Sequence, residues 1–148
     1  MAKLADTLLK PDVRPNLVRE CVQVVDEEVA SKGGLSGFAI KAAYKVVKGI
    51  KPTIIHESVD GMFDDMVKNL ESFWEQYEKS GKAQSFDSYA SANKGVVADA
   101  LLKVSDDRAA RTTHSTIKSA YEKLRPSGKK NVEEAVPRVA QLVGRHMK

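Results

Sequence analysis

Apolar side chains recur every three or four residues along most of this chain, which is the spacing of an amphipathic α-helix. The pattern is longest between Thr53 and Ser80, where it continues for about seven turns. Its apolar positions are Ile55, Val59, Met62, Phe63, Met66, Val67, Leu70, Phe73, Trp74 and Tyr77. This segment is predicted to be a long central helix. Gly61 is its weak point, because glycine costs about 1 kcal/mol relative to alanine inside a helix, and a bend or break is expected there if anywhere.

The same spacing, together with helix breakers and caps, places the other helices. They are expected near residues 3–10, 16–31, 36–48, 86–92, 94–104, 115–124 and 130–147, with a further turn or two after Ser105. Ser36, Asn93 and Ser105 are plausible N-caps. Gly33-Gly34 should end the helix at 16–31. Pro126-Ser127-Gly128 is typical of a turn, and Pro137 should kink the last helix or mark a boundary. The pattern as a whole predicts an all-α bundle of about seven helices.

A short motif occurs twice, at an offset of 77 residues: Ile40-Lys41-Ala42-Ala43-Tyr44 returns as Ile117-Lys118-Ser119-Ala120-Tyr121. In each copy the isoleucine, the second alanine position and the tyrosine lie at i, i+3 and i+4, so they share one helix face. The motif therefore predicts two degenerate repeats, about 1–80 and 81–148, within a single domain 1–148. Both tyrosines are expected to face the core.

Length and cysteine content limit the class of protein. At 148 residues the chain is long enough for one domain that buries roughly two-thirds of its unfolded surface. Cys21 is the single cysteine, so no intramolecular disulfide can form, and a reducing, cytoplasmic setting is expected. The first residues lack the apolar core of a signal peptide, and no apolar run approaches a membrane span.

The net charge of +4 is unevenly distributed. Residues 53–107 carry 5 Lys and Arg against 11 Asp and Glu, whereas residues 108–148 carry 10 against 3. A basic surface is possible where the two halves meet, and its candidate anion-binding residues are Lys41, Lys45, Lys48, Lys118, Arg125, Lys129 and Lys130. No helix-turn-helix or RNA-binding signature accompanies them, so solvated helix faces are the favoured interpretation.

Motifs that carry chemistry are weak. Gly33-Gly34-Leu35-Ser36-Gly37 before a helix resembles a phosphate cradle, but it lacks the lysine position and the strand of a P-loop. His56, Asp60 and Asp64 share one helix edge, without any second cluster that would complete a metal site. No nucleophile elbow is present. The sequence therefore predicts no catalytic residue, no metal site and no cofactor.

Three further segments suggest a family. The run Lys32-Gly33-Gly34-Leu35-Ser36-Gly37 with Ile40-Lys41-Ala42-Ala43-Tyr44, the segment Ala100-Leu101-Leu102, and Val132-Glu133-Glu134-Ala135-Val136-Pro137-Arg138 together resemble a family of small bacterial proteins of unknown function. The resemblance covers most of the chain and implies a helical protein. It brings no active site to transfer.

These observations favour a non-enzymatic binding or scaffolding protein with an apolar or protein partner, which includes a homodimer. A module that binds nucleic acid or another polyanion through the basic C-terminal half is the alternative. An enzyme whose site is assembled only in the tertiary structure is the third possibility.

Overall fold

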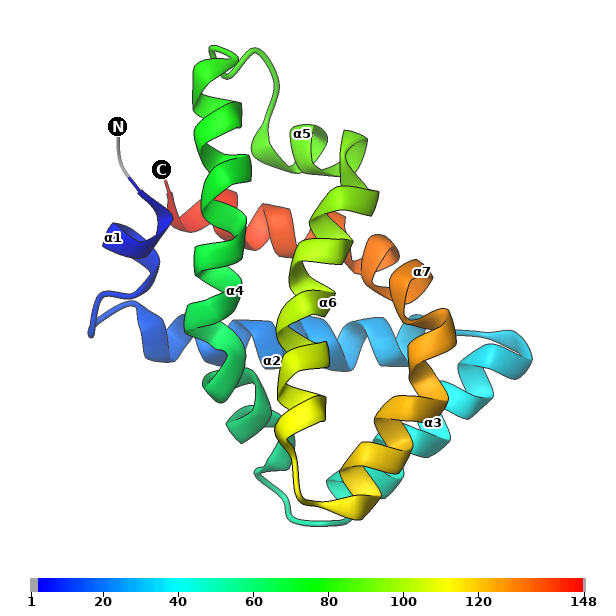
Figure 1. The fold of residues 1–148 in the computed structure, drawn as a ribbon. Helices are drawn as coiled ribbons and strands as arrows, with labels where there is room; N and C mark the ends of the chain where they lie inside the picture. The colour runs from blue at the N-terminus through cyan, green and yellow to red at the C-terminus, as the bar shows by residue number, and fades with distance from the viewer. Residues whose placement is uncertain (1–2, 148) are drawn as a thin grey trace.

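The computed structural model describes residues 3–147, and this part of the chain forms seven helices and no strand, which confirms the all-α prediction (Figure 1). The helices are α1 (Leu4–Leu8), α2 (Arg14–Ser31), α3 (Gly34–Lys48), α4 (Ile54–Lys79), α5 (Phe86–Ala92), α6 (Lys94–Arg111) and α7 (Ser115–His146). None of these helices is long and apolar enough to cross a membrane.

The helices pack in two crossing layers. In Figure 1, α4 and α6 run side by side in front, and α2 and the C-terminal part of α7 cross behind them. The N-terminal part of α7 packs against α3 at the lower edge of the view. Buried residues of six helices form one hydrophobic cluster, and α3 alone contributes none to it.

An aromatic cluster closes the end of the core near the tip of α4. Trp74 and Tyr77 on α4 meet Phe86 on α5, with ring centroids 5.0 to 5.3 Å apart. Two of the three ring pairs pack edge to face, the geometry that the quadrupoles of aromatic rings favour. The Tyr77 hydroxyl donates a hydrogen bond of 2.8 Å to the carbonyl oxygen of Gln84, so the burial of this ring leaves no unsatisfied hydroxyl.

The predicted long helix is confirmed, and it continues through Gly61 without a break. A Cβ atom at Gly61 would lie 2.5 Å from Nη1 of Arg108. The missing side chain therefore leaves room for the Arg108 guanidinium to lie directly against the α4 backbone. Glycine at this position leaves that space to the end of the Arg108 side chain.

Two predicted boundaries are wrong. Helix α6 runs through Ser105, whose hydroxyl donates to the carbonyl oxygen of Leu102 instead of capping a new helix. Helix α7 runs through Pro126 and Pro137, although neither proline can donate a backbone hydrogen bond. The helix bends between its orange and red parts in Figure 1. The turns on either side of each proline thus continue the helix at the cost of a change in direction.

Of the predicted caps, Ser36 differs in position and Asn93 does not. Helix α3 begins at Gly34, two residues before Ser36, and Gly33 is its N-cap. Gly34 has a φ of 71°, a left-handed conformation that glycine adopts without strain. Asn93 is the N-cap residue of α6, as predicted, but its side chain donates to the carbonyl oxygen of Tyr89 at the end of α5 and makes no capping hydrogen bond to α6.

Glu71 is predicted to hold the N-terminal helix in place. Its carboxylate on α4 accepts hydrogen bonds from the backbone N–H groups of Leu4 (3.0 Å) and Ala5 (2.7 Å), and the Leu4 side chain is completely buried. Glu71→Ala removes the acceptor of both N–H groups and should lower the free energy of unfolding by about 1 to 2 kcal/mol. Urea denaturation measures the change.

Glu75→Ala is the matched control, one turn further along α4 on an exposed position. An equal loss of stability in both variants would contradict the role assigned to Glu71.

Candidate functional site

An apolar cavity of about 350 Å³ lies between the two helix layers. Most of its wall comes from α2, α4 and α7, with shorter contributions from α1, α3 and α6. The apolar residues of the wall are Leu8, Leu17, Cys21, Val24, Val25, Val29, Ile40, Val59, Met62, Phe63, Met66, Val67, Leu70, Leu101, Leu102, Val132, Ala135, Val139, Leu142 and Val143. Only Glu28, Lys32, Ser105 and Asn131 add polar groups.

The side chains around the cavity do not fill the space that their helices enclose. Val25, Val29, Met62, Met66 and Val139 point inward as the spacing predicts, yet each of them remains partly accessible. Valine is short and its χ1 angle is restricted, so valine-rich faces on two crossing helices cannot extend to close a gap. The cavity is therefore a consequence of residue size on α2 and α7.

The hollow opens to the surface, so part of its apolar wall stays in contact with solvent. Leaving apolar surface in water costs about 25 cal/mol per Å². Water gains little in such a site, because a water molecule needs two to four polar partners. An apolar occupant would remove the cost.

Charged side chains form a neutralised cluster at one edge of the cavity. Lys32 Nζ lies 3.2 Å from Glu28 Oε2 and 2.7 Å from Glu134 Oε2, and Arg138 Nε lies 3.4 Å from Glu28 Oε1. The hydrogen bond from Lys32 lowers the pKa of the Glu134 carboxyl. Each cation of the cluster thus has a carboxylate partner, although Arg138 Nη1 is buried without a hydrogen-bond partner.

Cys21 contributes an unreactive thiol to the wall. Its side chain packs against the hydrophobic core, and burial raises the pKa of the thiol to about 12. A thiol is nucleophilic only as the thiolate, so Cys21 stays protonated and behaves as a small apolar side chain.

A second groove, of about 430 Å³, adjoins the first and brings together the two copies of the repeated motif. Ala43 and Tyr44 of α3 face it from one side, and Ala120 and Tyr121 of α7 face it from the other. Both tyrosine side chains are half-buried. Met62 and Ser105 also line this groove; they are shared with the central cavity. The predicted alanine-and-tyrosine faces thus meet each other, while the two-repeat architecture itself stays a prediction.

The hydroxyl of each of these tyrosines donates to an aspartate on the preceding helix. Tyr44 donates to Asp26 on α2, and Tyr121 donates to Asp106 on α6. Arg125 also binds Asp106, through Nε at 2.8 Å, and this hydrogen bond is the main reason why the pKa of the Asp106 carboxyl is lowered. Burial, followed by the hydrogen bond to Asp106, raises the pKa of Tyr121.

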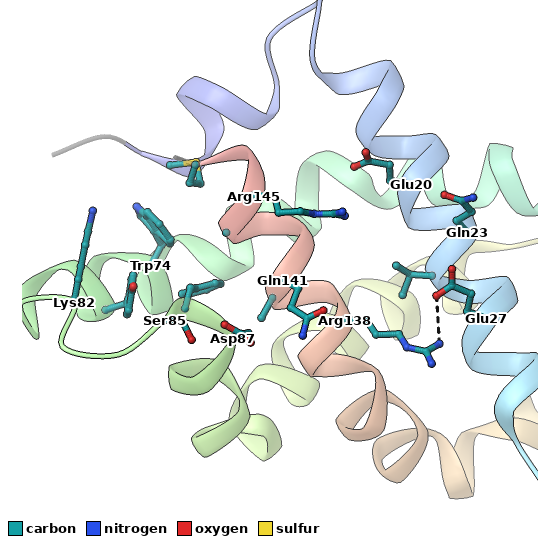
Figure 2. Close-up of a pocket in the computed structure, with 16 residues that line it drawn as sticks. Glu20, Gln23, Glu27, Trp74, Lys82, Ser85, Asp87, Arg138, Gln141 and Arg145 are labelled. Atoms are coloured by element: carbon teal, nitrogen blue, oxygen red, sulfur yellow. Dashed lines mark ion pairs between the residues drawn. The ribbon is translucent and has the colours of Figure 1, made fainter.

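An open groove of about 790 Å³, with both polar and apolar lining, lies between α2, the C-terminal part of α7 and the α4–α5 connection. Figure 2 shows Glu20, Gln23 and Glu27 projecting from α2 opposite arginines of α7. Arg138 Nη1 lies 3.5 Å from Glu27 Oε2, and His146 Nε2 lies 2.8 Å from Glu20 Oε2. These pairs tie the two helices together across the groove. Among residues 3–147, no group of three His, Cys, Asp or Glu side chains is placed to hold a metal ion.

The predicted anion-binding residues lie in different surroundings. Arg125 is paired with Asp106, and Lys129 Nζ lies 3.2 Å from Asp99 Oδ2. Lys48 Nζ lies 5.3 Å from the centroid of the Tyr44 ring. The remaining members occupy exposed positions on α3 and α7: Lys41, Lys45, Lys118 and Lys130. Carboxylates therefore neutralise part of the basic surface that the sequence predicts. Binding of a polyanion to this surface stays a prediction.

Of the three residues that share one edge of α4, His56, Asp60 and Asp64, the two aspartates pair with an arginine. Arg14 Nη1 binds Asp60 Oδ1 at 2.5 Å, and its Nε binds Asp64 Oδ1 at 2.9 Å. This pairing joins the start of α2 to α4 and lowers the pKa of the Asp60 carboxyl.

The model of a family of unknown function, DUF6918, matches residues 4–147. The chain belongs to this family. This finding agrees with the resemblance to an uncharacterised helical family that its glycine-rich and alanine-rich segments suggest. No curated protein and no solved structure matches the chain significantly.

Sequence reasoning placed most of the cavity residues on inward faces but did not predict the space between them. The sequence does contain a signal for this space, which is the size of the side chains at the inward positions. The inward positions of α2 and α7 are mostly valine, where a tightly packed bundle would place leucine. Such short side chains on several crossing helices indicate an incompletely filled interior.

We expect the Asp106 pairing to contribute to stability in a pH-dependent way. Because the pKa of this carboxyl is lowered in the folded protein, its contribution is present above the unfolded value of about 3.9 and is lost as the pH falls through the folded value. Asp106→Asn should therefore lower the free energy of unfolding at neutral pH. The difference from the wild type should shrink below about pH 4. Urea denaturation across this pH range measures it.

Asp107→Asn provides the comparison, because Asp107 is exposed and makes only a 3.6 Å pair with Lys103 one turn away. A pH dependence of the same size in both variants would contradict the assignment to Asp106.

Proposed function

We propose that this protein is a non-enzymatic binding protein that encloses a small, uncharged, apolar molecule in its central cavity. The observation that carries the proposal is the cavity of about 350 Å³ with an almost entirely apolar wall. Its volume falls within the range of about 300 to 1,000 Å³ that is typical of ligand pockets. A bound hydrocarbon would replace the packing that the valine side chains do not supply.

The polar groups of the wall support an uncharged ligand. Ser105 already donates to the Leu102 carbonyl, and the Asn131 side chain donates to Ser127 Oγ at 3.3 Å. Lys32 and Glu28 are paired with each other. None of these groups needs a ligand atom as its partner, so an incoming carboxylate or phosphate would have to break an existing pair.

Two methionines provide adaptable walls. Met62 and Met66 are flexible side chains that change shape with little strain, which suits a site that admits ligands of more than one shape. Met62 also lines the tyrosine groove. A change of its rotamer is therefore the simplest way to connect the cavity with that groove, and this is the entry route that we favour.

The alternatives remain separate hypotheses. A polyanion-binding module would lose its affinity for DNA steeply with rising salt, and indifference to DNA at low salt would remove that hypothesis. A scaffold would need a protein partner, and the simplest such partner is a second copy of this chain. An enzyme would need reactive groups gathered in one pocket.

Filling the cavity should abolish ligand binding. Ala135 lines the cavity on α7, and Ala135→Phe places a ring in the space. We expect an uncharged naphthylamine dye, whose fluorescence rises in apolar surroundings, to bind the wild type at about one site per chain and the variant at least about tenfold more weakly. The variant should also be more stable to heat, by about 0.5 to 2 kcal/mol, because it fills a void.

Ala30→Phe is the control, since it makes the same chemical change at an exposed position of α2 outside the cavity wall. Val139→Leu is a smaller filling substitution that tests the idea should the phenylalanine be too large. Absence of dye binding to the wild type, or equal dye affinity in the cavity-filling and control variants, would overturn the proposal.

A further inference from the structure

Helix α3 has an exposed apolar face that the bundle does not cover. Leu35 is 92% exposed, Phe38 is 75% exposed and Val46 is 55% exposed. Together with the exposed Ala42, they lie at i, i+3, i+7 and i+11, which places them on one stripe of the helix. The opposite face carries Ile40, Ala43, Tyr44 and Val47 and lines the central cavity or the tyrosine groove. Helix α3 is therefore apolar on two opposite faces, of which only one is packed.

Charge on α3 is entirely positive. The helix contains no aspartate or glutamate, and its lysines Lys41, Lys45 and Lys48 are all exposed. Counted at the helical period, Lys41 and Lys45 lie roughly 80 to 120° from Leu35 around the axis, so they flank the apolar stripe on one side. Within residues 3–147, neither of these two lysines forms an ion pair.

We propose that α3 docks on the surface of a membrane that contains anionic lipids. An apolar stripe bordered by lysines is the pattern of a helix that lies in the interface, with its apolar side chains among the acyl chains and its cations among the headgroups. The positive flank complements anionic headgroups, and the large side chains of Leu35 and Phe38 supply the apolar contact. The helix would lie on the bilayer and not cross it, in keeping with the absence of a membrane-spanning helix in residues 3–147.

A second copy of the chain fits this face less well. Pairing two α3 helices would bring two sets of lysines together, and α3 offers no carboxylate to neutralise them. The docking does not depend on an occupant of the central cavity. The same helix supplies Ile40 to the cavity wall, so a docked α3 would place the cavity close to the lipid.

Vesicle flotation of the full chain tests the proposal. We expect the protein to float with vesicles of phosphatidylcholine and phosphatidylglycerol, to bind pure phosphatidylcholine vesicles much more weakly, and to lose binding as salt rises. The double variant K41E/K45E should lower the partition coefficient by at least about 25-fold, because each lysine near an anionic surface contributes roughly fivefold. Phe38→Ser should lower it by about tenfold.

Two controls make the same changes elsewhere. The double variant K68E/K79E reverses two exposed lysines of α4, and Val96→Ser removes an apolar side chain that is 58% exposed on α6. K68E/K79E changes the net charge by the same amount as K41E/K45E, and Val96→Ser leaves it unchanged. Both control variants should bind vesicles like the wild type. Three results would overturn the proposal: no flotation with anionic vesicles at low salt, equal losses in the α3 and control variants, or a dimer that dissociates on Phe38→Ser.

Discussion

The separation between the two helix layers is the constraint on which the rest of the structure depends. Helices α2 and α7 cross behind α4 and α6 (Figure 1), and ion pairs join the two layers. Arg14 of α2 binds Asp60 and Asp64 of α4, and Lys129 of α7 pairs with Asp99 of α6. Between these anchors the inward side chains are short, so a cavity remains.

The same constraint explains why α3 is unusual. Every other helix contributes to the main buried cluster. The alanine and tyrosine face of α3 instead lines the groove beside the cavity. Small alanines allow close approach, and each tyrosine ring is packed while its hydroxyl reaches an aspartate. Helix α3 is thus attached at one face only. An element of this kind can present Leu35 and Phe38 to a surface without exposing the core.

Periodicity was enough to predict the helices, because the stripe on α4 repeats over its whole length and α5 is bounded by a serine cap and Asn93. Its failures have local causes. Glycine at position 61 is a weak point for a helix considered alone, but Arg108 from the neighbouring α6 occupies the space beside it. Pro126 is typical of a turn, but α7 packs against its neighbours and stays helical on both sides of it. The cavity and the exposed stripe of α3 depend on distances between helices, which no pattern within one helix contains.

Native mass spectrometry of the protein, purified gently from its own host, tests the central claim most directly. The account predicts a folded chain that carries one uncharged, apolar compound, which organic solvent releases and which a second spectrum of the extract identifies. A folded chain without any bound compound, whose cavity also takes up none when apolar compounds are added, would contradict the claim that this interior is a binding site.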